Sequence, residues 1–317
     1  MLDRLGPPGA LRVVDVPDPA AAPGHAVIDV AWASVTFVET QVRAGRPPHP
    51  RMIPDLPAVL GNGVAGTVAE VGEGVDTSWV GRRVVSTTGG RGGYAERVAV
   101  PAALLIPVPD GLELRTAAAL LADGRTALGL IRTSRLTAGE VMLVEAAAGG
   151  VGTCLVQLGR SGGATVIAGV GSPDKFEVVE QLGADLVVDY SAPNWSAAVR
   201  KQFDGIDVVF DGVGGDVGET AVELLLPGGR LCRYGMASGR YTQVPSSRPD
   251  IETLEGLGLP PEDWHALSIA ALERAASGEL RATIGQEYPL DRVADAHAAI
   301  EARSTTGKTL LRIGAGR

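Results

Sequence analysis

Hydrophobic and polar residues alternate in short runs along the first third of the chain, and glycine or proline separates the runs. Residues 11–108 contain several of these runs, rich in valine and isoleucine. Runs of this kind, bounded by turn residues, are typical of β-strands. We therefore expect a mostly antiparallel β domain here, with its clearest strands at 25–30, 66–71 and 83–86.

The pattern changes after residue 112. Alanine and leucine recur at helical spacing over 112–135, and Thr116 is a plausible helix cap. After Gly139 the order becomes strand, turn and helix, repeated in the manner of a parallel sheet. The apolar runs suit strands that are buried on both faces, at 141–144, 165–168, 186–189, 207–211 and 230–234. The fold class is therefore α/β, with a Rossmann-type doubly wound parallel sheet beside the β domain.

The last third of the chain returns to the first domain. Residues 240–261 show little periodicity and are expected to form a connection, apart from the leucine- and glycine-rich stretch 254–259, which could shape a pocket or a dimer seam. Helices are expected at 264–277 and 291–303, and a strand at 308–313. This assigns residues 1–118 and 260–317 to a substrate domain and residues 119–259 to a nucleotide domain.

Composition fits this organisation and narrows the possible partners. A chain of 317 residues with 45% hydrophobic and 21% charged residues is long enough for two globular domains. Its net charge of −9 disfavours a nucleic-acid partner. No apolar stretch is long enough for a membrane span, and the N-terminus lacks the pattern of a secretory signal, so we expect a cytoplasmic protein.

The cysteines and histidines give no metal-binding pattern. Cys154 and Cys232 are far apart and lie among apolar residues, which favours core thiols in a reducing compartment. The four histidines show no paired spacing with them. We therefore expect no metal site.

A glycine-rich turn follows the first strand of the nucleotide domain. Within Ala147–Gly152, Ala147 replaces the first glycine of the Gly-x-Gly-x-x-Gly pattern, and Gly149, Gly150, Val151 and Gly152 follow. A turn without bulky side chains lets backbone N–H groups and the helix N-terminus approach a pyrophosphate. The turn and its strand and helix context predict a dinucleotide site.

The end of the second strand of this domain indicates which dinucleotide. NAD-binding folds usually place an acid there to hold the ribose 2′-hydroxyl, whereas this chain has Gly169 to Ser172. Ser172, Lys175 and Tyr190 could hold a 2′-phosphate through one charge and two donors, so NADPH is favoured over NADH. In the alternative interpretation Lys175 is a solvated helix residue and Tyr190 a packing aromatic, and Asp174 weakens the local positive field.

The chain resembles the zinc-independent quinone oxidoreductase (zeta-crystallin-like) branch of the medium-chain dehydrogenase/reductase superfamily over nearly its whole length. The motifs that carry the resemblance are Val71-Gly72-Glu73-Gly74-Val75, Gly92-Gly93-Tyr94-Ala95-Glu96, Pro107-Val108-Pro109-Asp110-Gly111, Ala146 to Gly152, Gly171-Ser172-Pro173-Asp174-Lys175, Leu182-Gly183-Ala184-Asp185 and Gly307-Lys308-Thr309. The resemblance implies a GroES-like β domain, a Rossmann domain that binds NADPH, and a homodimer. It also implies further cofactor contacts from Thr126, Gly214, Tyr234, Gly235 and Met236.

The chain departs from this family in its substrate half. Gly61-Asn62-Gly63 stands where zinc-dependent relatives have a Gly-His-Glu ligand segment, and Ser34-Val35-Thr36 covers their cysteine position, which argues against a catalytic zinc. Thr36-Phe37-Val38-Glu39-Thr40-Gln41 replaces the usual Asn-Phe-Ile-Asp and following tyrosine, so the substrate is expected to differ. Asp123-Gly124-Arg125 replaces an uncharged segment, and its two charges are either substrate contacts or a local pair.

These residues lead to a function and to candidate catalytic groups. We expect hydride transfer from NADPH to a quinone or an α,β-unsaturated carbonyl compound, with Thr36, Gln41 or Asn62 as a donor to the developing oxyanion. Glu39 could be an acid or a solvated loop charge, whereas Tyr94 and His297 are expected to pack in the core. The alternatives are an enoyl reductase or redox-tailoring enzyme for a larger natural product, and a non-catalytic NADPH-binding protein.

Overall fold

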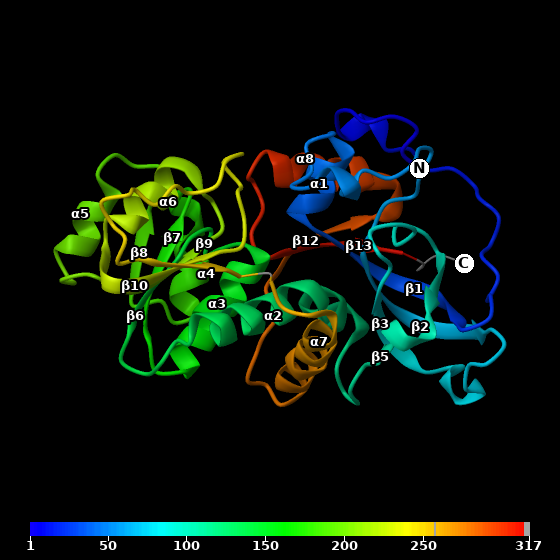
Figure 1. Cartoon of the computed structure of the whole chain (residues 1–317). Coiled ribbons are helices and arrows are strands. Elements are labelled where there is room, and N and C mark those ends of the chain that lie inside the picture. The colour runs from blue at the N-terminus through cyan, green and yellow to red at the C-terminus, as the bar shows by residue number, and fades with distance from the viewer. Residues whose placement is uncertain (257, 314–317) are drawn as a thin grey trace. The chain divides into compact units, whose positions relative to one another are not determined.

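The computed structural model of the chain describes residues 1–256 and 258–313, which form two compact units (Figure 1). One unit comprises Met1–Ala122 and Ser268–Arg317, and the other comprises Asp123–Leu267. The chain passes from the first unit to the second within helix α2 (Leu114–Ser134) and returns within helix α7 (Pro261–Ala276).

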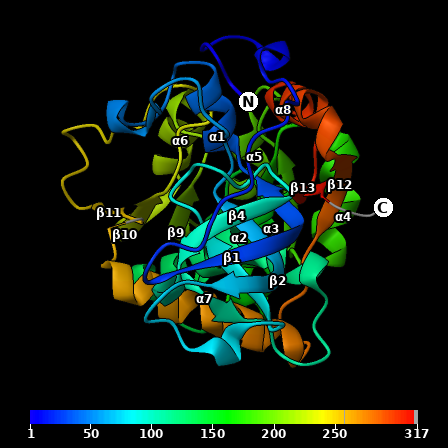
Figure 2. The ribbon, with the colours of Figure 1, turned by 90° about the vertical axis from the view of Figure 1, so that its right-hand side faces the viewer.

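The first unit is built on a seven-stranded sheet in the order β12-β13-β1-β2-β3-β5, with β4 paired to β1. Strand β1 lies beside β2 and β4 in Figure 2. All of its strand pairs are antiparallel except β12 with β13. The expectation of a mostly antiparallel β domain is thus confirmed. The strands are β1 (His25–Val35), β2 (Gly63–Val71), β3 (Arg83–Thr87), β4 (Arg97–Pro101), β5 (Ile106–Pro107), β12 (Ile284–Pro289) and β13 (Lys308–Arg312).

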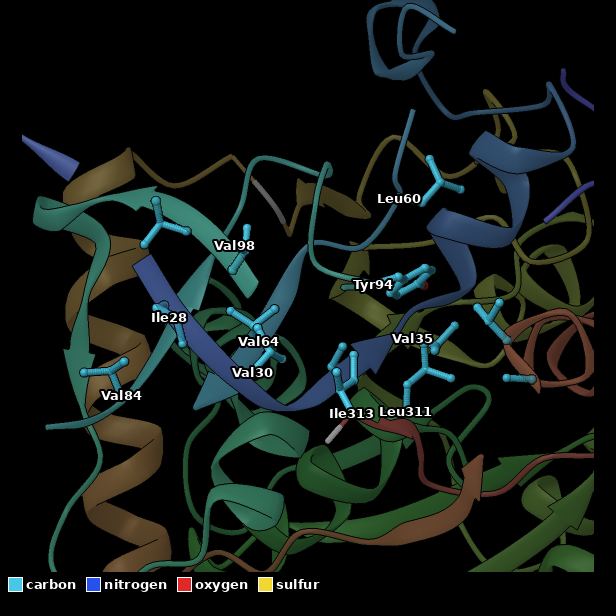
Figure 3. Close-up of a cluster of buried hydrophobic side chains, with 14 of the residues drawn as sticks. Ile28, Val30, Val35, Leu60, Val64, Val84, Tyr94, Val98, Leu311 and Ile313 are labelled. Carbon is cyan, nitrogen blue, oxygen red and sulfur yellow. The ribbon is translucent and has the colours of Figure 1, made fainter. Parts of the chain in front are cut away.

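The side chains on the inner faces of these strands form the core of the first unit (Figure 3). Alternate residues of a strand point to one face, so the valines and isoleucines of the period-two runs meet in one layer. Ile28, Val64 and Val84 are completely buried there, and Tyr94 is 8% exposed among them. The burial of these apolar side chains is the main stabilisation of the unit.

Two helices of the first unit carry polar side chains into this core. They are α1 (Phe37–Arg43) and α8 (Val293–Glu301). Helix α1 begins with a capping box, in which the side chain of Thr36 accepts from the backbone of Glu39 and the Glu39 side chain accepts from the backbone of Thr36. The sequence Thr-x-x-Glu therefore fixes where α1 starts.

The second unit is a six-stranded parallel sheet in the order β11-β10-β9-β6-β7-β8. Helices α3 to α6 flank it (Figure 1). The order places β6 in the middle, with the chain turning to one side for β7 and to the other for β9, as in a Rossmann fold. The elements are β6 (Val141–Val144), α3 (Gly150–Ser161), β7 (Thr165–Val170), α4 (Phe176–Gln181), β8 (Leu186–Asp189), α5 (Trp195–Arg200), β9 (Ile206–Asp211), α6 (Gly215–Val222), β10 (Leu225–Arg233) and β11 (Glu252–Glu255).

Three local expectations need correction. Helix α2 begins at Leu114, so Thr116 lies in its first turn and is not its cap. Strand β11 lies within the segment expected to be a connection, and β12 was not expected at all. Both are edge strands in their sheets with mostly exposed or half-buried side chains, so they lack the apolar pattern of a buried strand. Leu257, in the stretch 254–259, lies outside the described residues.

None of the described helices has the length and hydrophobicity needed to cross a membrane.

Candidate active site

The glycine-rich turn connects β6 to α3 and leaves the N-terminus of the helix uncapped by any side chain. Gly149 is the N-cap residue in an extended conformation. A Cβ atom on Gly152 would overlap the carbonyl oxygen of Ala146, so the last glycine is required by the close packing of α3 on the turn. The first-turn N–H groups of a helix have no partner within the helix, which makes this turn suited to an anion.

The charged segment on α2 separates into two different environments. The carboxylate of Asp123 lies directly over Gly150, where a Cβ atom would overlap it. The guanidinium of Arg125 instead lies 5.8 Å from the centroid of the Trp264 ring, and burial lowers the pKa of this arginine. Asp123 therefore borders the glycine turn, whereas Arg125 packs against α7. Thr126 is half-buried on the same helix.

The three residues expected at a 2′-phosphate follow the ends of β7 and β8. The ring of Tyr190 packs across the strand end, and a Cβ atom on Gly171 would lie 3.2 Å from its hydroxyl oxygen. Ser172 precedes a short 3₁₀ turn that ends at Lys175. Ser172 hydrogen-bonds to Asp174, which lowers the pKa of that carboxyl. The structure thus brings these groups to one edge of the sheet, with Asp174 beside them.

The remaining cofactor candidates lie at the ends of β9 and β10, and Asp211 holds them together. The backbone N–H of Gly214 donates to Asp211 Oδ1 at 2.7 Å, and Gly214 has a positive φ of 72°. The N–H groups of Tyr234 and Gly235 both donate to the carbonyl oxygen of Asp211, at 2.9 and 3.2 Å. Met236 follows them. Apart from Thr126, every cofactor candidate therefore follows the carboxyl end of a parallel strand, where such folds bind ligands.

The first unit contains a buried polar cluster around Glu39, whose side chain is 6% exposed. Its Oε2 accepts from the backbone N–H of Thr36 at 2.6 Å and from the Thr36 hydroxyl at 2.9 Å. Its Oε1 accepts from the backbone N–H of Asn62 at 2.8 Å. Burial raises the pKa of Glu39, and these donors and the charge of Lys308 oppose the increase. Glu39 is therefore not a solvated loop charge.

Tyr94 and His297 extend this cluster into the core. The Tyr94 hydroxyl lies 3.2 Å from His297 Nε2, and the two rings meet edge to face. Burial, followed by the charge of Glu39 and a hydrogen bond to it, raises the pKa of Tyr94 well above its usual value. Burial, followed by the charge of Arg43, lowers the pKa of His297 to about 3. Both residues pack in the core as expected, but they also link Glu39 to α8.

The three candidate oxyanion donors differ in how far their hydrogens are already used. The Thr36 hydroxyl donates to Glu39, and Gln41 Nε2 donates to the Thr40 hydroxyl at 3.1 Å. Asn62 uses its Oδ1 to accept from Gly90 at 2.9 Å, so its side-chain NH₂ group is not engaged by that bond. The structure joins Thr36 and Asn62 through Glu39, whereas Gln41 bonds to its own helix.

Sequence reasoning missed two groups in the second unit. Glu145 directly follows strand β6, and Asp211 is the last residue of the adjacent strand β9. Both residues are buried. The sequence signal that could have identified them is an acidic residue at the end of each of the two apolar runs that form β6 and β9. Within residues 1–256 and 258–313, no group of three or more histidine, cysteine, aspartate or glutamate side chains is placed to hold a metal ion.

Comparison with known proteins agrees with the two-unit fold. Residues 22–110 match the family model of the alcohol dehydrogenase GroES-like domain, and residues 150–256 match that of the zinc-binding dehydrogenase. The Pseudomonas aeruginosa quinone oxidoreductase is 34% identical over 96% of each chain. A 2-haloacrylate reductase from a Burkholderia species is 31% identical over 98% of this chain and 97% of its own. The solved structure of Escherichia coli quinone oxidoreductase complexed with NADPH is 28% identical, with a TM-score of 0.89 over 98% of each chain.

These matches and the two folds define an oxidoreductase of the medium-chain dehydrogenase/reductase superfamily. Within this superfamily the chain belongs to the quinone oxidoreductase branch, as the family resemblance of its motifs implied.

Proposed function

We propose that this protein is an NADPH-dependent reductase that transfers hydride to a quinone or an α,β-unsaturated carbonyl compound without zinc. The observation that carries the proposal is the edge of the parallel sheet, where an uncapped glycine turn, a strand end without an acid and the Gly214 turn lie together. This edge offers backbone donors to a pyrophosphate and side-chain donors to a 2′-phosphate. The NADPH complex of the Escherichia coli relative supports the same cofactor.

The residues of the second unit fit a bound dinucleotide. Gly149, Gly150, Val151 and Gly152 would hold the pyrophosphate through backbone N–H groups at the N-terminus of α3, which no side chain caps. Lys175 would supply the charge for the 2′-phosphate, with Ser172 and Tyr190 as hydroxyl donors. Thr126, Gly214, Tyr234, Gly235 and Met236 would line the ribose and nicotinamide. NADPH, when bound, supplies the hydride.

Among the catalytic candidates, Asn62 has the side-chain donor that is most available to stabilise an oxyanion. Hydride addition to a conjugated carbonyl or quinone leaves negative charge on oxygen, which a fixed N–H donor stabilises. The backbone of Asn62 is held by Glu39 and its side-chain oxygen by Gly90, so its NH₂ group is oriented before substrate binds. Thr36 and Gln41 remain candidates, although the Thr36 hydroxyl hydrogen and one of the two Gln41 amide hydrogens are already used in the protein.

Zinc independence is supported by the side chains available in the first unit. Asn62 and Ser34 stand in the segments that carry zinc ligands in zinc-dependent relatives, and neither an amide nor a neutral hydroxyl is among the usual zinc ligands. The substrate must then be electrophilic enough to accept hydride without a metal to polarise it. Quinones and enones meet this requirement because conjugation delocalises the negative charge that hydride addition creates. Their reduced forms can then take a proton from water.

One relative favours a second substrate class. The Burkholderia 2-haloacrylate reductase matches nearly the whole chain, so an activated alkene is a specific alternative to a quinone. An enoyl reductase or redox-tailoring enzyme for a larger natural product would use the same hydride transfer but a different substrate pocket. A non-catalytic protein would instead bind NADPH without turnover. We also propose a homodimer in the cytoplasm, with a small molecule rather than nucleic acid or membrane as its partner.

The test is steady-state oxidation of NADPH and NADH by chelator-treated protein, with 1,4-benzoquinone, 2-chloroacrylate and simple enones as acceptors. We expect turnover with at least one acceptor and a preference for NADPH of at least about tenfold, which corresponds to one charge-assisted contact to the 2′-phosphate. Tight NADPH binding without turnover of any acceptor would favour the non-catalytic alternative. Activity that is lost on chelation and restored by zinc would refute zinc independence.

A further inference from the structure

Two carboxyl groups lie side by side at the cofactor edge of the parallel sheet. Glu145 directly follows β6 and Asp211 ends β9, and these strands pair with Val144 opposite Phe210. Glu145 is 1% exposed and Asp211 is completely buried. Burying two carboxylates together is strongly unfavourable unless they share a proton or have cationic partners.

The hydrogen bonds of the pair show how it is satisfied. Glu145 Oε2 accepts from the backbone N–H of Val213 at 3.1 Å, and Asp211 Oδ1 accepts from that of Gly214 at 2.7 Å. The other two oxygens, Glu145 Oε1 and Asp211 Oδ2, are buried and have no hydrogen-bond donor of fixed protonation among the described residues. Burial, followed by the charge and the neighbouring carboxyl of Asp211, raises the pKa of Glu145 well above its usual value. Two buried, neighbouring carboxyl groups that lack other donors can satisfy each other only when one of them carries a proton and donates it to the other.

The pair therefore holds three strand ends in one arrangement. Its acceptors fix Val213 and Gly214, and Gly214 is the N-cap of α6, where a Cβ atom would overlap the carbonyl oxygen of Arg240. The hydroxyl of Tyr234, beyond the end of β10, donates to the carbonyl oxygen of Glu145 at 3.2 Å. The turn that carries Gly214 can thus shift only if its hydrogen bonds to the two carboxyl groups are broken.

Other acidic groups face the same edge. Burial raises the pKa of Tyr234, and the charges of Glu145, Asp211, Tyr190 and Asp123 raise it further. A second negative charge on the carboxyl pair would therefore be repelled by its surroundings as well as by its partner.

We propose that Glu145 is a positioning residue for the cofactor, and that Glu145 and Asp211 act as a pair sharing one proton to hold the Val213–Gly214 turn in its binding conformation. This inference rests on the proposed NADPH binding. Glu145 needs no contact with the cofactor for this role, because it acts through the backbone N–H of Val213 and through Asp211. The pair adds one negative charge to the site instead of two, which matters where an anionic dinucleotide is to bind.

The test compares Glu145→Gln with Glu145→Asp in the full-length protein, with the exposed Glu180→Gln as the matched control. A glutamine can accept from Val213 with its oxygen and donate to Asp211 with its NH₂ group, so it reproduces the protonated pair. An aspartate keeps the acid but is one methylene too short to span the same groups. We expect the NADPH dissociation constant, measured by nicotinamide fluorescence, to stay within about threefold for Glu145→Gln and to rise at least about tenfold for Glu145→Asp.

Infrared difference spectroscopy at mildly alkaline pH can detect the protonated carboxyl of the pair in the protein without any cofactor. We expect a carboxylic-acid carbonyl band in the wild-type protein that is absent from Glu145→Gln and kept by Glu180→Gln.

Lack of the band in the wild type, or its persistence in Glu145→Gln, would overturn the shared proton. Unchanged NADPH affinity in Glu145→Asp, or affinity lost in Glu145→Gln, would overturn the positioning role. If the wild type binds no NADPH, the proposed function and the positioning role both fail, whereas the infrared result still decides the shared proton.

Discussion

His297 should make the folded protein sensitive to mild acid. This histidine is completely buried on α8, and its Nε2 lies 3.2 Å from the Tyr94 hydroxyl, while its Nδ1 has no hydrogen-bond partner within residues 1–256 and 258–313. Burial, with the charge of Arg43 as a smaller cause, lowers its pKa from the ordinary value of 6.5 to about 3. The unfolded chain therefore takes up a proton below about pH 6.5 that the folded protein does not accept until about pH 3.

The sign and size of the effect follow from this difference. Lowering the pH favours the state that binds the proton, so the stability contributed by neutral His297 is complete above its unfolded pKa and is lost as the pH falls toward 3. The free energy of unfolding should decrease by about 2 kcal/mol between neutral pH and ~pH 5 because of this one group. Near ~pH 4 the loss should reach roughly 3 kcal/mol, which is a large part of the stability of an ordinary domain.

The assay is urea denaturation of the wild type and of His297→Gln at a series of pH values. Glutamine cannot titrate, so the difference in unfolding free energy between the two proteins should shrink as the pH falls, by about 2 kcal/mol by ~pH 5. The absolute cost of the substitution does not enter, because only its pH dependence is used. His49→Gln, which removes an exposed imidazole, is the matched control. Parallel pH profiles for the wild type and His297→Gln would refute the reasoning.

Three further predictions concern the two units separately. Gly152→Ala should abolish NADPH binding or unfold the second unit, because the methyl group overlaps the backbone of the turn, whereas Gly9→Ala, with open space around it, should be neutral in calorimetry and cofactor binding. Glu39→Ala should lower the free energy of unfolding by about 3 kcal/mol, since it leaves buried N–H groups unpaired, and the exposed Glu73→Ala should change it by less than about 0.5 kcal/mol. Lys175→Ala should weaken NADPH binding at least about tenfold and leave NADH binding nearly unchanged, and equal losses for both would count against a 2′-phosphate contact.

The fold could be predicted from the sequence wherever the spacing of apolar residues indicates which side chains are buried. The period-two runs of the β domain and the apolar runs of the parallel sheet each describe side chains that meet one core, so their strands were found at nearly the observed positions. The edge strands β11 and β12 were missed because they are held mainly by backbone hydrogen bonds to one neighbour, which leave no mark on the pattern.

The candidate site could be predicted where the reason for a residue is local. The Gly149–Gly152 turn is such a case, because its neighbours in the chain already show a strand before it and a helix after it. Glu39 and Glu145 are different, since each is held by N–H groups far along the chain, 23 residues away at Asn62 and 68 residues away at Val213. A buried acid of this kind looks like any surface acid until the fold brings its partners to it.

Hydride transfer from NADPH without a metal is the central claim, and a single-turnover experiment tests it most directly. Chelator-treated protein in excess over NADPH is mixed rapidly with benzoquinone, 2-chloroacrylate or an enone, while the absorbance of the reduced nicotinamide is followed. The account predicts that the absorbance falls in one phase whose rate depends on the acceptor and is unchanged by added zinc. Bound NADPH whose absorbance stays constant with every acceptor, or falls only after zinc is added, would contradict it.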